Sequence, residues 1–337
     1  MKGKPLPILK RIVGTIALPL LMYFLVMWLC YANGKGRVFE RMWIPIVPNI
    51  AISVCCAMGI GLQFKNGRFD FSGGSIMLLS AIIAGNVAIR SGNNLILMCV
   101  LCVVCCVVLS LLIGAFYVLA RVPIIITTVG FALLYESITC LIFGGTGINV
   151  LANMTLNQCA RFPIALIPMA AAILIYAIYG YLTTSGREAQ LLANNQQVAV
   201  NIGVNENRNA LISYFVSGLL FGCATIVWIA KAKHDAAYNS MSTVSELFSN
   251  ILPVFIGLML ARFCGDAIGT VIGSVTLSLL SYGLTAVFSN NLSSAITNIS
   301  MGVFILLINV VSAQGRHFLQ SIAKVLFHNA KESRGKV

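Results

Sequence analysis

Ten long apolar segments follow one another along the chain, separated by short polar connections. They cover residues 12–32, 43–63, 71–89, 94–120, 122–143, 162–182, 209–230, 247–261, 267–288 and 294–313. A helix needs about 20 apolar residues to cross a bilayer, and most of these segments are that long. The runs are continuous, whereas strands of a membrane barrel alternate apolar and polar residues over about ten positions. The pattern therefore predicts an all-α, polytopic transmembrane helical bundle of eight to ten spans, with ten preferred.

Two segments need a separate interpretation. The first follows a basic start, residues 1–11, which resembles a signal peptide. Its apolar run is about 20 residues long and no small-x-small cleavage site follows, so we expect it to be retained as the first helix. The segment 247–261 is short, and a re-entrant segment is an alternative to a full span there. We expect the chain, residues 1–337, to form a single transmembrane domain.

Composition excludes a water-soluble protein. Of the 337 residues, 59% are hydrophobic and 9% are charged, against roughly 25% charged residues in ordinary soluble domains. The net charge of +13 follows from the topology: with both termini cytoplasmic, 15 of the 22 lysines and arginines lie on the cytoplasmic side, as expected for short connections between spans. The basic residues are dispersed among the spans and not gathered on one face, which argues against a nucleic-acid partner.

Eleven cysteines raise the question of a metal or redox site, because Cys102 and Cys105 have the C-x-x-C spacing. No histidine or second cysteine pair lies nearby in the sequence. Cysteine is also a small apolar residue that packs well inside helices. We therefore interpret the cysteine-rich span as packing and predict no metal.

Two polar connections stand out by length. Residues 183–208 lie on the predicted cytoplasmic side, where Glu188 to Val200 could form a short amphipathic helix that ends near Gly203. Residues Lys231 to Glu246 lie on the other side and could cap a pathway or meet an external partner. Long connections in compact proteins tend to be functional, so we expect the first to dock onto another protein.

Polar residues inside the predicted spans are candidates for a translocation pathway, because burying them in a bilayer is costly. Asp70 and Glu136 are the acidic candidates, and Asn49, Ser72 and Thr127 are the neutral ones. Asp70 could instead cap the helix that starts near Phe71 or pair with Arg68. Glu136 lies in the middle of its segment, and whether it contacts a solute or only bonds a neighbouring helix stays open.

Three short motifs follow one another along the chain: the first contains Gly59, Asp70, Ser72, Gly74 and Ser75; the second Gly186, Arg187, Asn195 and Gly203; the third Gly269, Thr270, Ile272 and Gly273. In their order and spacing they resemble the ribose/xylose/galactose-type ABC transporter permease family, the inner-membrane components of bacterial binding-protein-dependent transport. The stretch 121–128 is also similar to the family, and the resemblance covers about residues 45–312. The chain departs from the family at Lys65, Asn66 and Arg68, where the family is apolar, and at Ala193-Asn194, where the family has two glycines.

The resemblance implies a permease subunit of an importer in the bacterial inner membrane, with a small polar solute, most simply a monosaccharide. It also implies three partners: cytoplasmic ATPase subunits, a second permease that forms a homo- or heterodimer, and an extracytoplasmic solute-binding protein. The sequence has no G-x-x-x-x-G-K-[ST] phosphate loop. ATP and Mg would therefore be bound by the ATPase, and the chain itself is not expected to be an enzyme or to hold a cofactor.

In this interpretation residues 186–203 of the cytoplasmic connection dock into the ATPase and couple it to the spans. The residues assigned to that contact are Gly186, Arg187, Asn194, Asn195, Gln196 and Gly203. Gly186 and Gly203 would permit the turns at the two ends of the segment.

Two alternatives remain open from the sequence. Within the same transporter class, the solute could be a nucleoside, an autoinducer sugar or a branched-chain amino acid. A different class, a secondary transporter driven by an ion gradient, would use Asp70 and Glu136 for coupling. A neighbouring ATPase gene and binding-protein gene would favour the ABC importer.

Overall fold

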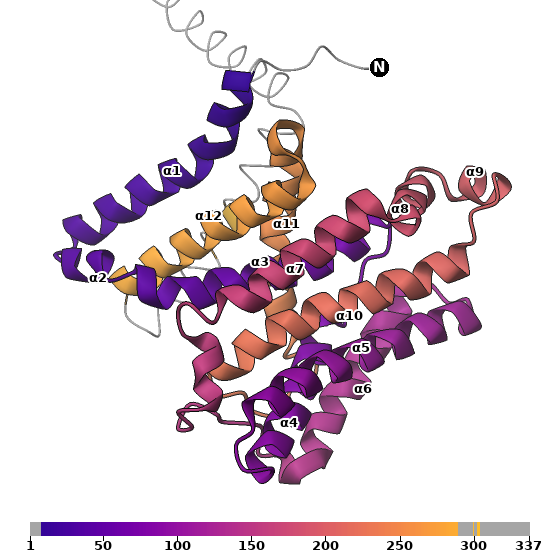
Figure 1. Ribbon diagram of the computed structural model, residues 1–337, viewed down its shortest axis with the longest axis horizontal. Coiled ribbons are helices and arrows are strands. Elements are labelled where there is room, and N and C mark those ends of the chain that lie inside the picture. The colour runs from indigo at the N-terminus through magenta and orange to yellow at the C-terminus, as the bar shows by residue number, and fades with distance from the viewer. Residues whose placement is uncertain (1–7, 289–298, 300–301, 304–337) are drawn as a thin grey trace, which may run out of the picture.

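The computed structural model describes residues 8–288, 299 and 302–303, which form a bundle of helices (Figure 1). The long helices are α1 (Ile8–Ala32), α3 (Trp43–Lys65), α4 (Gly73–Arg90), α5 (Leu95–Ala120), α6 (Ile124–Leu141), α7 (Leu166–Ala177), α10 (Glu206–Lys231), α11 (Val244–Cys264) and α12 (Asp266–Val287). The shorter elements are α2 (Gly36–Glu40), η1 (Ile142–Gly145), η2 (Leu156–Ala160), η3 (Ile178–Leu182), α8 (Thr184–Asn194) and α9 (Gln196–Asn201). Within the described residues, eight helices are long and apolar enough to cross a membrane, or nine if the bent pair 166–194 is one span.

These helices confirm the all-α, polytopic fold, and nine of the ten predicted segments coincide with them. The segment 247–261 belongs to the 21-residue helix α11, which meets the length and hydropathy of a span. The tenth predicted segment, 294–313, lies outside the described residues. Pro45, Pro123 and Pro168 lie in the first turn of a helix or just before it, where proline costs little or no helical hydrogen bonding.

The connections gather at two opposite ends of the bundle. At one end, Lys65 forms an ion pair with Asp266, and the α5–α6 connection faces α9 across a cleft. We call this the α8 end; Figure 1 shows α8 and α9 projecting from it. At the other end, Lys35 donates to the last carbonyls of α12, Ala286 and Val287. We call this the α2 end. The two ends hold the same sets of connections that the sequence assigned to the two sides of the membrane.

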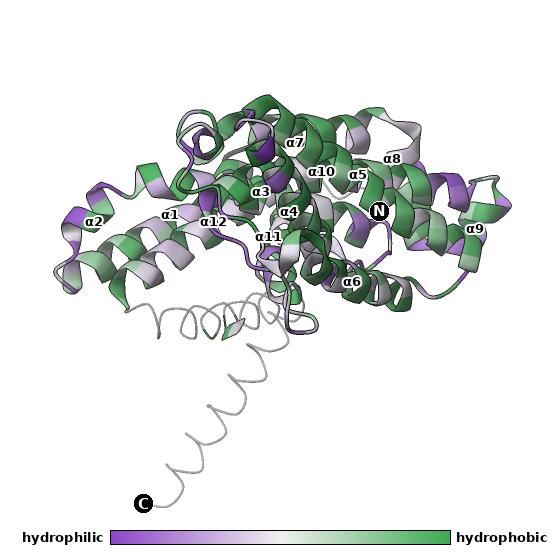
Figure 2. Ribbon diagram, turned by 90° about the horizontal axis from the view of Figure 1, so that it is seen from below, coloured by the Kyte–Doolittle hydropathy of each residue, from purple (hydrophilic) through white to green (hydrophobic). Residues whose placement is uncertain are grey.

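Helix α10 lies at the centre and α1 at the edge. Of the most apolar window of each helix, 78% is buried in α10 and only 11% in α1, so α1 leaves its apolar surface for lipid. Figure 2 shows many helical residues in green, and the strongly hydrophilic residues, in purple, mainly in the connections and at helix ends. Close packing between helices relies on glycine: a Cβ at Gly218 or Gly222 would meet the backbone of α5. Such small-residue contacts are typical of helices packed in membranes.

Helix α4 begins inside the bundle and not at its surface. Gly73, the first residue of α4, lies against Phe221, which is in the middle of α10. The neighbouring Gly74 lies against the backbone of Thr243, which immediately precedes α11. The chain therefore folds back from the end of α3 through residues 66–72, and the first turns of α4 and α11 meet in the interior.

Candidate functional site

Glu136 is buried on α6 and binds the start of α11. Its carboxylate accepts hydrogen bonds from the Met241 amide (2.7 Å), the Thr243 amide (2.8 Å) and the Thr243 hydroxyl (2.6 Å). A buried carboxylate is tolerated when its oxygens receive such donors. Glu136 therefore ties α6 to the segment before α11.

Asp70 and Ser72 form the turn that leads into α4. Asp70 Oδ1 accepts from the amide of Ser72 (2.7 Å) and from its hydroxyl. The proposed pairing with Arg68 is wrong, because Arg68 instead donates to the Ser213 hydroxyl at 2.9 Å. The proposed helix cap is also wrong in detail: Ser72 is the N-cap residue of α4, and Asp70 supports the preceding turn. Asp70 Oδ2 is buried and has no hydrogen-bond partner among the described residues.

The two remaining pathway candidates differ in position. The Thr127 hydroxyl turns back to the Pro123 carbonyl of its own helix, a weak contact of 3.4 Å, and Thr127 is buried. Asn49 lies on α3 and lines a cleft at the α2 end. The five predicted residues are thus not brought together at one place.

The cleft at the α2 end has a volume of about 530 Å³, which is within the range of small-molecule sites. It lies between α3, the end of α10, and helices α11 and α12. Half of its lining side chains carry amide or hydroxyl groups, namely Asn49, Ser53, Ser249, Asn250, Ser278, Ser281, Tyr282 and Thr285. Trp228 adds an aromatic ring, Lys231 and Lys233 add positive charges, and Glu246 adds a negative one. Such a lining offers many neutral hydrogen-bond partners to a small polar molecule.

The sequence did not single out Lys231, Glu246, Asn250 or Trp228. Lys231 and Glu246 were taken as the limits of an external connection, whereas they are the last residue of α10 and a residue in the first turn of α11. The available signal was the length of that connection, which was expected to cap a pathway. The structure places its two ends on the cleft wall.

His234 fixes the connection between α10 and α11 to the end of α10. Its ring stacks on Trp228 with centroids 3.5 Å apart, and its Nε2 contacts the Trp228 carbonyl at 2.9 Å. Its backbone pairs with Ile148 in both directions, at 2.7 and 2.9 Å. Burial lowers the pKa of His234 below its usual value, because the charged imidazolium would lose solvation. The neutral ring is therefore part of a fixed wall beside the cleft.

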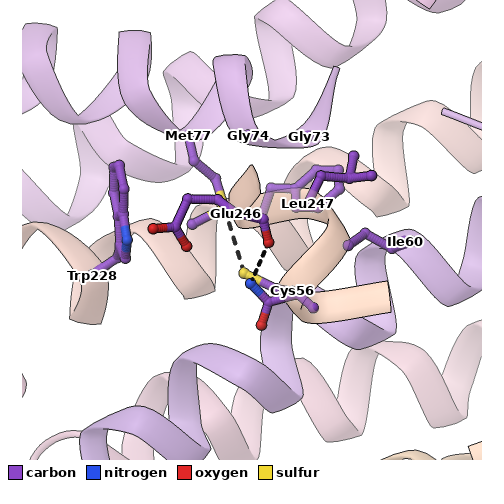
Figure 3. A pocket seen from close by; sticks show the side chains of 10 residues that line it. Cys56, Ile60, Gly73, Gly74, Met77, Trp228, Glu246 and Leu247 are labelled. Atoms are coloured by element: carbon purple, nitrogen blue, oxygen red, sulfur yellow. Dashed lines mark hydrogen bonds between the residues drawn. The ribbon is translucent and has the colours of Figure 1, made fainter. Parts of the chain in front are cut away.

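A narrow pocket continues from the cleft towards the interior (Figure 3). Trp228, Glu246 and Asn250 line both spaces. Beyond them the pocket reaches Gly73 and Gly74, at the point where α4 and α11 begin. Glu246 thus lies between the open cleft and the meeting point of the two helix starts.

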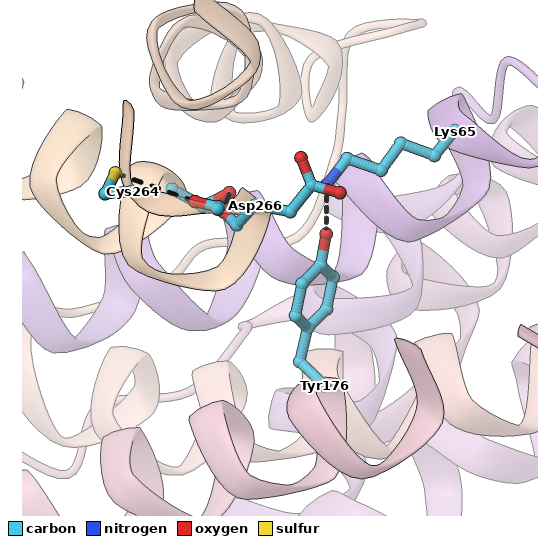
Figure 4. Close-up of polar contacts among 6 residues, drawn as sticks. Lys65, Tyr176, Cys264 and Asp266 are labelled. Carbon is cyan, nitrogen blue, oxygen red and sulfur yellow. Dashed lines mark hydrogen bonds and ion pairs between the residues drawn. The ribbon is translucent and has the colours of Figure 1, made fainter. Parts of the chain in front are cut away.

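A polar cluster closes the α8 end of the bundle (Figure 4). Lys65 Nζ lies 3.0 Å from Asp266 Oδ2 and donates to the Tyr176 hydroxyl at 2.6 Å. The three residues come from α3, α12 and α7. Next to them, Asn66 donates to Tyr179 at 3.4 Å. The cluster borders a small pocket that Gly186 and Gln190 of α8 also line, so it lies directly beside the connection 183–208.

That connection folds into two helices, which corrects the prediction of one helix from Glu188 to Val200. Asn195 breaks the helix with an extended backbone (φ −159°, ψ 101°) and caps α9 by accepting from the Val198 amide. Gly203 follows α9 with φ +96°, as predicted for a stop. Gly186 has another role than the predicted turn: it lies in the first turn of α8, where the Tyr179 carbonyl leaves no room for a Cβ.

The surface of the two helices is both charged and apolar. Arg187, Asn194, Asn195 and Gln196 are exposed, as a docking segment requires. Val198, Val200 and Ile202 are exposed apolar residues on or next to α9. Between α9 and the α5–α6 connection lies a cleft of about 680 Å³. An exposed apolar group beside a cleft is a feature of protein interaction sites.

Comparison with known proteins gives a consistent set of similarities. The model of one family, described as branched-chain amino acid transport system / permease component, matches residues 45–311. The autoinducer 2 import system permease protein LsrC of Photorhabdus luminescens is 27% identical over 237 residues, which cover 69% of this chain and 71% of that protein. LsrC of Yersinia pseudotuberculosis (strain IP 31758) is 26% identical over 269 residues, 79% of this chain and 75% of that protein. The ribose import permease protein RbsC of Escherichia coli K12 is 26% identical over 251 residues, 71% and 76% of the two chains.

Proposed function

Because the chain belongs to the family of branched-chain amino acid transport system permease components, we propose that it is the membrane-spanning permease subunit of an ABC importer for a monosaccharide. The single observation that carries the choice of solute is the polar cleft at the α2 end. Its amide and hydroxyl side chains match the hydroxyl groups of a sugar, and Trp228 offers an aromatic face for the sugar's C–H groups. The ribose and autoinducer 2 permeases among its relatives support the same solute class.

The α2 end faces the extracytoplasmic side in this proposal, and the α8 end faces the cytoplasm. A solute-binding protein delivers the solute to the cleft, and two cytoplasmic ATPase subunits bind at the α8 end. A second permease subunit completes the pathway. The membrane is the bacterial inner membrane, where such importers work.

Residues 186–203, within the connection 183–208, form the segment that contacts the ATPase. Its support is structural: α8 lies beside the Lys65–Asp266 cluster that joins α3, α12 and α7. A displacement of α8 would reach three spans through that cluster. The displacement of one packed helix against others can shift the equilibrium between two states of a gate.

An ion-coupled secondary transporter fits the residues less well. Glu136, the leading candidate for ion coupling, has both carboxylate oxygens engaged by the segment before α11. Its release for an ion would break three hydrogen bonds that hold α11 in place. The family assignment points in the same direction.

A branched-chain amino acid is the second candidate solute. Lys231 and Glu246 line the same cleft and could bind the carboxylate and ammonium groups of a zwitterion. Eight of the lining side chains carry hydroxyl or amide groups, against four apolar ones, Ile52, Trp228, Ala232 and Leu277, which favours the sugar.

Co-purification and uptake together test the proposal. Tagged protein is extracted in mild detergent, the bound proteins are identified by mass spectrometry, and the complex is placed in liposomes with labelled ribose, autoinducer 2 or leucine. We expect an ATPase to co-purify and uptake of ribose or autoinducer 2 to require ATP. If only leucine is taken up, the solute is a branched-chain amino acid and not a sugar. Purification without an ATPase, together with uptake driven by an ion gradient, would overturn the proposal.

A further inference from the structure

Two cysteines far apart in the sequence meet at the α2 end. Cys99 lies in α5, near its start, and Cys159 lies in η2, within the connection 142–165. Their sulfur atoms are 3.7 Å apart. All eleven cysteines belong to the described part of the chain, and no other two cysteine sulfurs in it are in such contact. The metal or redox motif suggested by the sequence, Cys102 and Cys105, is not this pair.

The two thiols are held together by the packing around them. The connection 142–165 is pinned by the backbone pairing of Ile148 with His234 and by a 2.7 Å hydrogen bond from Asn153 to Asn93. Leu156, one turn before Cys159, is buried in the same apolar cluster as Met98. The contact between the two sulfurs therefore does not depend on a mobile segment.

We propose that Cys99 and Cys159 form a disulfide that fixes the connection 142–165 onto α5. The inference rests on the proposed orientation, in which the α2 end lies outside the cytoplasm, where disulfides form and persist. A sulfur–sulfur bond is about 2.05 Å long, so the two sulfurs must approach from their 3.7 Å contact for the bond to form.

Thiol–disulfide exchange with an oxidised dithiol protein of the extracytoplasmic space supplies the chemistry. Cys99 is partly exposed and Cys159 is buried, so the Cys99 thiolate reacts first. It attacks the oxidant's disulfide, and one oxidant sulfur leaves as a thiolate. The Cys159 thiolate then attacks the Cys99 sulfur and releases the second oxidant sulfur. Two electrons pass to the oxidant, which takes up two protons and leaves as a dithiol.

The disulfide would restrain the wall of the candidate cleft indirectly. The connection 142–165 contacts His234 through Ile148, and His234 stacks on Trp228 of the cleft wall. A covalent bond between Cys99 and Cys159 would restrict the displacement of the connection while a binding protein attaches at this end. Its effect on transport is expected to be smaller than that of removing a cleft residue.

Thiol trapping in intact cells tests the inference. Free thiols are blocked with N-ethylmaleimide before lysis, and the full chain is purified and digested without reductant. Mass spectrometry is expected to find a peptide containing Cys99 linked to a peptide containing Cys159. The link should disappear in Cys99→Ser and in Cys159→Ser, each of which leaves the other cysteine blocked by the reagent. Cys105→Ser changes a partly buried cysteine of the same helix and should keep the link.

The outcomes separate this inference from the proposed function. If Cys99 and Cys159 are both blocked by the first reagent in a chain that binds an ATPase and imports solute, the disulfide is overturned and the function stands. If the link is present in a chain without an ATPase, the disulfide stands and the function fails. Blocked thiols together with a cytoplasmic α2 end would also overturn the disulfide.

Discussion

Glu136 and Glu246 lie near the start of α11 but have opposite surroundings. Glu136 is 2% exposed and accepts three hydrogen bonds from Met241 and Thr243. Glu246, in the first turn of the helix, is exposed to the cleft, and its carboxylate accepts no hydrogen bond from the described residues. One carboxylate therefore stabilises the fold, and the other is free to meet a solute.

Replacing each glutamate with glutamine should separate the two roles. Glu136→Gln places an amide NH₂ where one oxygen accepts from a backbone amide, so two donors face each other. We expect a loss of about 1.5–3 kcal/mol in stability and a lower melting temperature in detergent. Glu246→Gln should leave the melting temperature unchanged and reduce ATP-driven uptake. A Glu136→Gln protein that melts like the wild type would show that these hydrogen bonds contribute little.

The Lys65–Asp266 contact gives a second prediction at this scale. Lys65 is largely buried; it forms an ion pair with Asp266 and donates a hydrogen bond to Tyr176. Asp266 is about one-third exposed. Lys65→Met should lower stability by about 1 kcal/mol, because the solvent screens part of the pair's attraction. A double-mutant cycle with Asp266→Asn should show a coupling of about 0.5–1 kcal/mol in thermal or denaturant melts.

A matched ion pair in the same chain serves as the control. Lys233 and Asp235 are 2.6 Å apart, but both side chains are more than half exposed. Lys233→Met should therefore leave the melting temperature within error of the wild type. Equal effects of Lys65→Met and Lys233→Met would contradict the role assigned to the polar cluster.

Residue positions were predicted better than residue partners. Glu136 was found because a carboxylate in the middle of an apolar segment is unusual, but its donors lie 105 and 107 positions later in the chain. No local pattern indicates such a contact. Glu246 was missed because it lies at the edge of a polar connection, where an acidic residue is ordinary.

Among the elements, the helices themselves were predictable and their contacts were not. Long apolar runs predict the spans, and helices coincide with nine of the ten predicted segments; eight of these helices are long and apolar enough to cross a membrane, or nine if the bent pair 166–194 is one span. The break in the connection 183–208 was not predicted, because the residues on both sides of Asn195 fit the pattern of one continuous amphipathic helix. The Asn195 side chain competes for the backbone amide of Val198, which ends one helix and starts the next.

The motif Gly269, Thr270, Ile272 and Gly273 now has a structural reason. A Cβ at Gly269 would lie 2.6 Å from the Gly257 carbonyl oxygen, and one at Gly273 would lie 2.6 Å from the Pro253 carbonyl oxygen. Glycine at these positions lets α11 and α12 approach closely. The sequence showed the motif, but only the structure shows which helix it faces.

Gly269→Ala should therefore separate α11 from α12. The added methyl group meets backbone atoms, which cannot rotate away, so we expect a loss of about 1–3 kcal/mol in stability. Gly130→Ala on α6 is the control, because nothing lies within 4 Å of its Cβ position. It should be neutral or slightly stabilising, since alanine favours a helix over glycine. Equal melting temperatures of the two variants would contradict the close contact.

The connection 183–208 makes a separate prediction about binding. The Val198 side chain on α9 is 55% exposed, so it contributes little to packing within the chain. Val198→Asp should reduce co-purification of the ATPase at least tenfold while the melting temperature stays unchanged, because a charge replaces an apolar contact. Met154→Asp, an exposed residue of the α2 end, is the control and should keep the ATPase bound. Loss of the ATPase in both variants would point to misfolding and not to docking.

For the whole molecule, the sequence predicted which connections lie on the same side, and the structure brings them together at the α8 end and the α2 end. The alternation of spans alone accounts for this agreement, because each span carries the chain to the opposite side. The sidedness itself depends on the basic residues, and several of these, including Lys2 and Lys336, lie outside the described residues. Orientation thus remains a prediction from charge.

Cysteine labelling from each side of the membrane tests that orientation. Met154→Cys lies at the α2 end and Val198→Cys at the α8 end, and both positions are well exposed. A membrane-impermeant maleimide added to cells with a permeable outer envelope should label Met154→Cys several-fold above the wild-type chain and leave Val198→Cys at background. Inverted membrane vesicles should give the opposite result, because the excess of lysine and arginine holds the α8 end inside. Reversed labelling would place the cleft on the cytoplasmic side. The cleft could then not receive solute from a binding protein outside the cell, which would contradict the importer proposal.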